Sequence, residues 1–206
     1  MAVLQGQEGT LVLAAGSANQ ITRIDRSGAS IVTDAHSRYQ EPTRQGSVYL
    51  ASTQAGIATS VALSATQTGF TLTNPAGSGK NLVVIDALIA LTTAPAAGAT
   101  LVWAANVNPV ATAVVQTTPL VVRNAILGAG STAVGLAASA VTLPASPVVV
   151  RAIGGGVVAT GSVTTPFIRD EIAGSIILAP GTALSLSSLT TSISAVISVT
   201  WEEITI

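Results

Sequence analysis

The clearest pattern in the chain is an alternation of apolar and polar residues with a period of two. In the stretch 193–201 every second residue is apolar, and these residues are Ile193, Ala195, Ile197, Val199 and Trp201. The segments 68–74 (TGFTLTN) and 100–104 (TLVWA) repeat the pattern. Because successive side chains of a strand point to opposite faces, this spacing predicts half-buried β-strands.

Two stretches depart from simple alternation. Ile204 and Ile206 fall on the opposite parity from Trp201, which predicts a β-bulge near Glu202 and Glu203. The run 81–91 (NLVVIDALIAL) is apolar on both parities. Such a run indicates a strand that is covered on both sides or buried in an oligomer interface.

Proline and glycine separate these runs at the spacing of strand connections. The separators are Asn74-Pro75, Pro95, Pro109, Pro144, Pro147, Pro166 and Pro180-Gly181. A helical period appears only weakly, in the Ala-rich stretch 132–140, and no repeat of fixed length is present. We therefore expect an all-β fold with little helix, an antiparallel β-sandwich of jelly-roll type.

The charged residues divide the chain into two parts. The chain has eight basic and nine acidic residues, and eight of these seventeen lie among the first 45 residues. This distribution predicts an extended N-terminal arm (residues 1–45) and a nearly uncharged sandwich body (residues 46–206). A mixed-charge arm can be a solvated terminus, but its Leu, Ile and Val residues also suit contact with another surface.

Composition excludes several classes of partner. Only 8% of the 206 residues are charged and the net charge is -1, so a broad electrostatic surface for nucleic acid or anionic lipid is not expected. Although 49% of residues are hydrophobic, no window of about 18 residues is continuously apolar, as a membrane-spanning helix requires. The first residues lack the features of a secretory signal. We expect a soluble, unexported protein.

The chain is poorly equipped for catalysis or metal binding. It has no cysteine and a single histidine, so we expect no cofactor, no metal site and no enzymatic activity. The segment 74–81 (NPAGSGKN) imitates a phosphate-binding loop. It has Asn74 in place of the first glycine and Asn81 in place of the hydroxyl residue, and a strand follows where a helix should begin. It is predicted to be a turn.

Three groups of charged residues have other expected roles. His36, which lies near Asp34 and Arg38, is expected to pack or hydrogen-bond rather than to catalyse. Asp86 lies within a run of Val and Ile and needs a cation, for which Arg123 and Arg151 are the candidates. It is either a subunit-interface ion pair or an exposed strand residue. The residues 169–171 are predicted to form a solvated loop.

Three segments carry a resemblance to a known family. Residues 31–56 (IVTDAHSRYQEPTRQGSVYLASTQAG), 70–84 (FTLTNPAGSGKNLVV) and 177–204 (ILAPGTALSLSSLTTSISAVISVTWEEI) resemble small structural proteins of tailed bacteriophages. That family typically carries an NPAGSGK-N-L turn and ends in a PGTAL…WEE strand. The hairpin before the last strand is also similar to the end of trimeric jelly rolls of the tumour-necrosis-factor and C1q type, as an analogy of fold.

The resemblance implies a structural protein of a phage virion, assembled in the host cytoplasm. The expected function is a capsid decoration or cement protein that self-associates, most simply as a trimer, and docks on the major capsid protein or another virion protein. Arg23, Asp25, Arg26 and Arg38 are expected docking contacts, and Asp86 is an expected subunit contact. The alternative is a tail, baseplate or head-fibre component that binds a receptor or carbohydrate. Such a module usually needs aromatic platforms, and this chain has two Trp, two Tyr and two Phe.

Overall fold

The computed structural model describes residues 38–93, 95–106, 113–156 and 167–206. The chain divides into two compact units, residues 1–41 and 42–206, and the body lies entirely within the second. The only helix in the described part of the chain is α1 (Gln40–Arg44). No described helix is long and apolar enough to cross a membrane.

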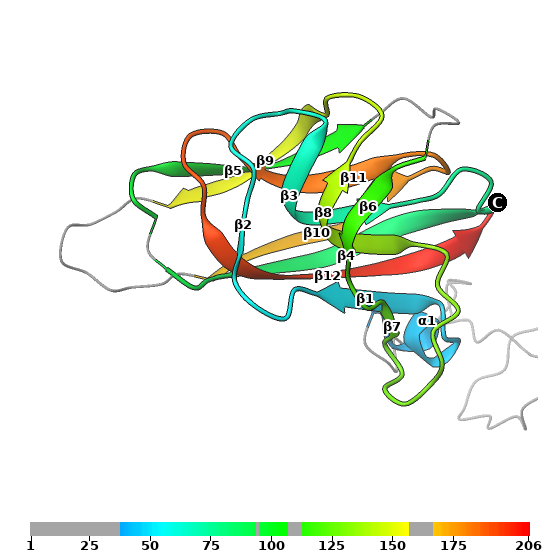
Figure 1. The fold of residues 1–206 in the computed structure, drawn as a ribbon. Helices are drawn as coiled ribbons and strands as arrows, with labels where there is room; N and C mark the ends of the chain where they lie inside the picture. The colour runs from blue at the N-terminus through cyan, green and yellow to red at the C-terminus, as the bar shows by residue number, and fades with distance from the viewer. Residues whose placement is uncertain (1–37, 94, 107–112, 157–166) are drawn as a thin grey trace, which may run out of the picture. The chain divides into compact units, whose positions relative to one another are not determined.

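Two antiparallel sheets form the body (Figure 1). The first sheet has the strand order β10 (Phe167–Leu178), β4 (Lys80–Leu91), β12 (Ser194–Thr205), β1 (Val48–Ser52) and β7 (Arg123–Asn124), with β2 (Ile57–Ala58) also paired to β12. The second sheet has the order β6 (Val115–Pro119), β8 (Leu136–Thr142), β3 (Thr66–Thr73), β11 (Ala183–Ser188), β5 (Ala99–Asn106) and β9 (Val148–Gly156).

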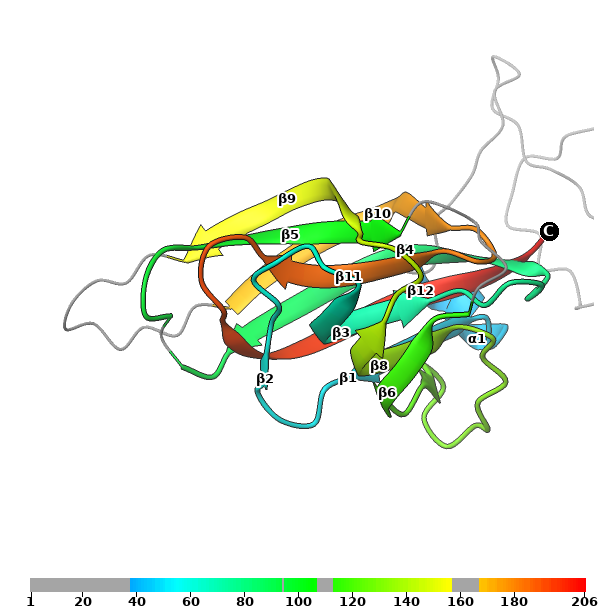
Figure 2. The ribbon, with the colours of Figure 1, turned by 45° about the horizontal axis from the view of Figure 1, so that its top comes forward.

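The strand pairing is that of a jelly roll. Eight strands pair in nested order along the chain: β1 with β12, β3 with β11, β4 with β10, and β5 with β9. This order is that of one long hairpin folded over into two sheets that face each other (Figure 2). The predicted all-β sandwich of jelly-roll type is confirmed.

The core lies between the two sheets. Along β12 every second residue from Ala195 to Glu203 is buried, and these residues face the inward side chains of β3, β5 and β11, among them Leu72, Trp103 and Leu186. The Tyr49 and Trp201 rings pack with their centroids 6.4 Å apart. The alternation in the sequence thus marks the inner face of the first sheet.

The bulge predicted near Glu202 and Glu203 lies slightly earlier along β12, and the inward parity of this strand does not change after Trp201. Glu203 keeps the inward position, and Ile204 and Ile206 are exposed. The register shift between β12 and β4 falls between Thr200 and Trp201, where Ile85 of β4 is the extra residue. A charged residue takes an inward position here because the surrounding chain supplies it with hydrogen-bond donors, which are described below.

Two other expectations also need correction. The run 81–91 is not covered on both sides within one chain, because Leu88 is 41% exposed whereas Leu82 is fully buried. The other alternative, burial in an oligomer interface, stays a prediction. The weakly helical stretch 132–140 overlaps strand β8, which pairs with β3 and β6. Pairing with two neighbouring strands outweighs the modest helix propensity of its alanines.

Leu82 and Leu88, two of the three leucines of β4, offer a test of the assignment of faces. Leu82→Ala removes a buried side chain and should lower the free energy of unfolding by about 2–5 kcal/mol. Leu88→Ala on the open face should change it by about 0.5 kcal/mol or less. Urea unfolding followed by tryptophan fluorescence measures both. Equal losses for the two variants would contradict the assignment of faces.

Candidate functional site

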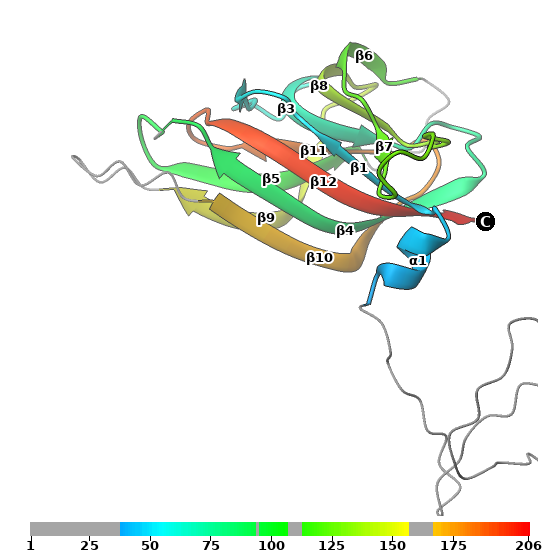
Figure 3. The same ribbon diagram turned by 90° about the horizontal axis from the view of Figure 1, so that it is seen from below.

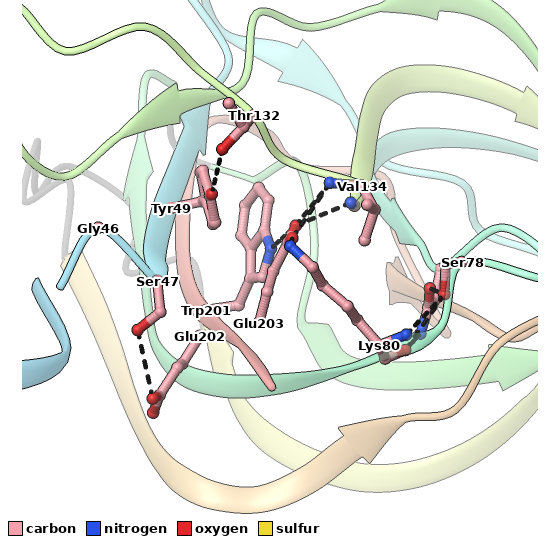
Figure 4. A network of polar contacts seen from close by, with 12 residues as sticks. Gly46, Ser47, Tyr49, Ser78, Lys80, Thr132, Val134, Trp201, Glu202 and Glu203 are labelled. Carbon is pink, nitrogen blue, oxygen red and sulfur yellow. Dashed lines mark hydrogen bonds and ion pairs between the residues drawn. The ribbon is translucent and has the colours of Figure 1, made fainter. Parts of the chain in front are cut away.

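The densest polar network in the described part of the chain surrounds Glu203 at one end of the sandwich (Figure 4). The Glu203 carboxylate accepts hydrogen bonds from the backbone N–H of Val134 at 3.0 and 3.1 Å and of Gly135 at 2.9 Å. Lys80 Nζ lies 3.0 Å from Oε2, and Trp201 Nε1 lies 3.4 Å from Oε1. The Glu203 side chain has no exposed surface.

Local sequence explains why the loop before β8 can approach so closely. A Cβ atom at position 135 would lie 2.9 Å from Trp201 Nε1 and 3.0 Å from a Leu82 methyl group, so the position is restricted to glycine. Thr132 of the same loop shares a 3.0 Å hydrogen bond with the Tyr49 hydroxyl. The loop is therefore held to both β12 and β1.

These contacts leave Glu203 without chemical freedom. A carboxylate offers about four acceptor positions, and two amides, an ammonium and an indole N–H occupy them. A buried charge is tolerated only when it is paired and hydrogen-bonded. Glu203 therefore acts as a clamp on the structure and is not free to act as a base or ligand.

Asp170 is a second buried carboxylate, and it joins the two sheets. Its Oδ2 accepts a 2.8 Å hydrogen bond from Trp103 Nε1, and its Oδ1 lies 2.7 Å from Arg151 Nη2. Arg151 also donates to Ser175 Oγ at 3.1 Å. The predicted loop at 169–171 is wrong, because these residues form part of β10.

Asp86 pairs with a cation that the sequence analysis did not consider. Arg169 Nε lies 3.0 and 3.2 Å from the two Asp86 oxygens, across the β10–β4 pair. The expected partners Arg123 and Arg151 are wrong, and Arg151 binds Asp170 instead. The role of Asp86 as a subunit contact stays a prediction.

The hydrogen bond from Arg169 to Asp86, followed by the charge of Asp86, raises the pKa of Arg169 above its ordinary value. A group whose pKa is raised by folding stabilises the fold at any pH below its ordinary pKa. That stabilisation is lost only as the pH rises through the folded-state pKa. The raised pKa of Arg169 therefore gives no pH dependence near neutrality.

The turn that imitates a phosphate loop is confirmed as a connection between β3 and β4. Asn74 is buried and its Nδ2 donates to the carbonyls of Lys80 and Leu178, both at 2.8 Å. Ser78 Oγ donates to Asn74 Oδ1 at 2.6 Å. The side chains of Asn74 and Ser78 therefore hold the turn, and Lys80 pairs with Glu203.

The expected docking residues are mostly outside the described ranges. Arg23, Asp25 and Arg26 lie there, as does His36. The Arg38 guanidinium lies 5.3 Å from the centroid of the Tyr39 ring, within cation–π distance. Within the described ranges, no three His, Asp or Glu side chains are grouped to hold a metal ion.

A groove of about 410 Å³ lies where the connection from β10 to β11 meets β5 and β9. Its lining carries no ionisable side chain and consists of Ala105, Asn106, Val150, residues 175–179 and residues 182–184. It can accept apolar groups, and although Ser175 and Thr182 bring hydroxyls to it, its lining has no ionisable side chain to act as a general base. Sequence reasoning did not find it, because residues from four strands and a turn form it.

The two adjacent glutamates of β12 test the clamp. Glu203→Gln should lower the free energy of unfolding by about 2–4 kcal/mol, because it removes a charge-assisted set of bonds and puts an amide N–H₂ against donors. Glu202→Gln is the matched control. Glu202 is partly exposed, and within the described residues it accepts a single 3.4 Å bond, from Ser47, so this substitution should lower the free energy of unfolding by about 0.5 kcal/mol. A similar effect at both positions in urea unfolding would exclude the clamp.

Comparison with known proteins leaves the function to be inferred from these residues. No family model, curated protein or solved structure matches this chain.

Proposed function

We propose that the chain is a non-enzymatic structural protein of a phage virion, a capsid decoration or cement protein whose copies associate and dock on the particle. The observation that carries the proposal is the use of the buried carboxylates. Glu203 and Asp170 are both occupied by internal donors. The ionisable groups buried in the described body thus stabilise it and are not presented to a substrate.

The body has the properties that a virion part needs. A jelly roll with a continuous core between two sheets gives a stable shape. The absence of cysteine removes any dependence on the redox state of the compartment in which the protein is assembled. The resemblance of residues 31–56, 70–84 and 177–204 to small structural proteins of tailed phages points to the same role.

The arm is proposed to dock the body onto the major capsid protein or another virion protein. Its charges of both signs can form ion pairs along a partner surface, and such pairs add specificity more than affinity. Arg23, Asp25, Arg26 and Arg38 are the proposed contacts. Exchange of the arm between subunits is the competing arrangement.

The burial of aromatic residues makes the receptor- or carbohydrate-binding alternative less favourable. Sugar-binding modules present aromatic faces to solvent, but Trp103, Trp201, Tyr49 and Phe70 are all buried in the sandwich. Phe167 is the described aromatic residue with a largely exposed ring. A single exposed ring is a poor platform for a sugar.

The copy number of the chain in the particle tests the proposal. Quantitative mass spectrometry of gradient-purified particles, from the host that carries the gene, should find hundreds of copies per particle if the protein decorates the capsid. A handful of copies would favour the tail or fibre alternative. Absence of the chain from the particles would overturn the virion proposal.

Charge reversal in the full chain tests the arm. Arg23→Glu combined with Arg26→Glu should weaken co-sedimentation with the particles at least tenfold, about 1.4 kcal/mol, without altering the oligomer. Arg123→Glu is the control, because Arg123 is exposed on the body. Undiminished binding of the arm variant, or an equal loss for Arg123→Glu, would contradict a docking role for the arm.

A further inference from the structure

The edge strands of the two described sheets differ in how well they are protected. On one side, β7 has two residues, and β6 has five residues that are mostly polar and end in Pro119. Short, polar or proline-containing edges resist pairing with other chains. On the other side, β9 has nine residues and β10 has twelve. Figure 3 shows β9 and β10 along the same flank of the body.

This side, the β9/β10 flank (residues 148–156 and 167–178), exposes a series of large apolar side chains. Those that are 43 to 72% exposed are Val148, Val149, Val150, Phe167 and Ile177. The 410 Å³ groove opens on the same flank, and Val150 and Ile177 line it. Val150 and Ile177 meet at the groove, with Val148 and Val149 next to it on β9, whereas Phe167 lies at the far end of β10 beyond the exposed Arg169 and Glu171. Clustered apolar surface such as that around the groove usually marks an interface.

The charges of the flank are of both signs, and most of them are paired. Arg151 is paired with Asp170 at 2.7 Å, and Arg169 is paired with Asp86 of the neighbouring strand. Glu171 adds one further negative charge. Two identical flanks can therefore approach without the repulsion that a patch of one sign would cause.

We propose that a second copy of this chain covers the β9/β10 flank and places apolar side chains in its groove. The proposal rests on the self-association contained in the proposed function and identifies the surface that performs it. A second copy is favoured over a different partner because the surface around the groove is apolar and the charges beside it are of both signs. An interface between two copies can close by symmetry, and a closed oligomer prevents open-ended association of the chain.

Side chains, and not a continuous backbone ladder, should make this contact. The register between β9 and β5 shifts at Ile153 and again at Val150, and the register between β10 and β4 shifts between Glu171 and Ile176. Bulges of this kind bend a strand edge and interrupt the row of free N–H and C=O groups. The groove beside Val150 then becomes the feature that fixes how the copies fit together.

The flank is large enough for a specific interface. Nine residues of strand at about 3.3 Å each give a length of about 30 Å, and two sheets about 10 Å apart with their side chains give a width of about 20 Å. The resulting area of roughly 600 Å² approaches the roughly 800 Å² that each partner buries in a standard interface.

Single cysteines test the proposal cleanly, because the chain has none of its own. Val150→Cys and Ile177→Cys report on the flank, and Val115→Cys on the opposite edge of the second sheet is the matched control, since Val115 is also exposed. The full-length variants are labelled with a maleimide over a range of protein concentrations. Light scattering of the same samples gives the mass.

We expect labelling at 150 and 177 to slow at least tenfold as the oligomer forms, whereas labelling at 115 stays independent of concentration. An oligomer in which positions 150 and 177 label as fast as in the dilute protein, or in which position 115 is protected equally, overturns the proposed surface. Ile177→Cys decides the matter if Val150→Cys does not fold, as judged by circular dichroism.

The result is separable from the test of the virion role. A chain that stays monomeric at tens of micromolar, a concentration at which interfaces with about −8 kcal/mol of binding free energy are filled, overturns both the flank proposal and self-association. Incorporation into particles would still be measured by copy number. Conversely, a chain that is absent from particles but shows the expected protection retains the interface and loses the virion role.

Discussion

The Glu203 carboxylate has to be neutralised inside the sandwich, and that requirement determines the structure around one end of it. Moving an unpaired carboxylate out of water costs several kcal/mol even after relaxation. Here the cost is offset by donors from three separate parts of the chain: Lys80 at the start of β4, Trp201 on β12, and the amides of Val134 and Gly135 before β8. The two strands and the loop must therefore form together.

Asp170 plays a related part between the sheets. It binds Trp103 of β5 and Arg151 of β9 from its place on β10, so the first sheet is fixed to the second by charge as well as by apolar contact. Both carboxylates serve the fold, and this use of scarce charged residues suits a protein that acts through its shape and surface. Because Asp170 also pairs with Arg151, the surface beside the groove is mainly apolar, and this is the surface proposed to contact a second copy.

The fold could be predicted because it depends on local pattern. The alternation at 193–201 identified the inner face of β12, and the proline and glycine spacing identified the strand connections. The predictions failed where the role of a side chain depends on the register between strands. Glu203 continues the inward parity of Trp201, so its burial was readable in principle, but its partner Gly135 lies 68 residues away.

Pairing of charges across strands was beyond the sequence for a similar reason. Asp86 meets Arg169 only because β10 pairs with β4 in one particular register, and a bulge between Glu171 and Ile176 contributes to that register. From the sequence, Arg123 and Arg151 were equally good candidates for the partner of Asp86. The groove could not be foreseen either, because Val150, Ser175 and Thr182 come together only in the folded sandwich.

We propose that this jelly-roll body acts by docking on a virion, with its copies in contact along the β9/β10 flank. The decisive measurement is a cryo-electron microscopy map of purified particles. Two-sheet sandwich density should repeat over the capsid surface, with the flank against a neighbouring copy. Sandwich density confined to the tail, or isolated copies whose β9 and β10 face solvent, would contradict it.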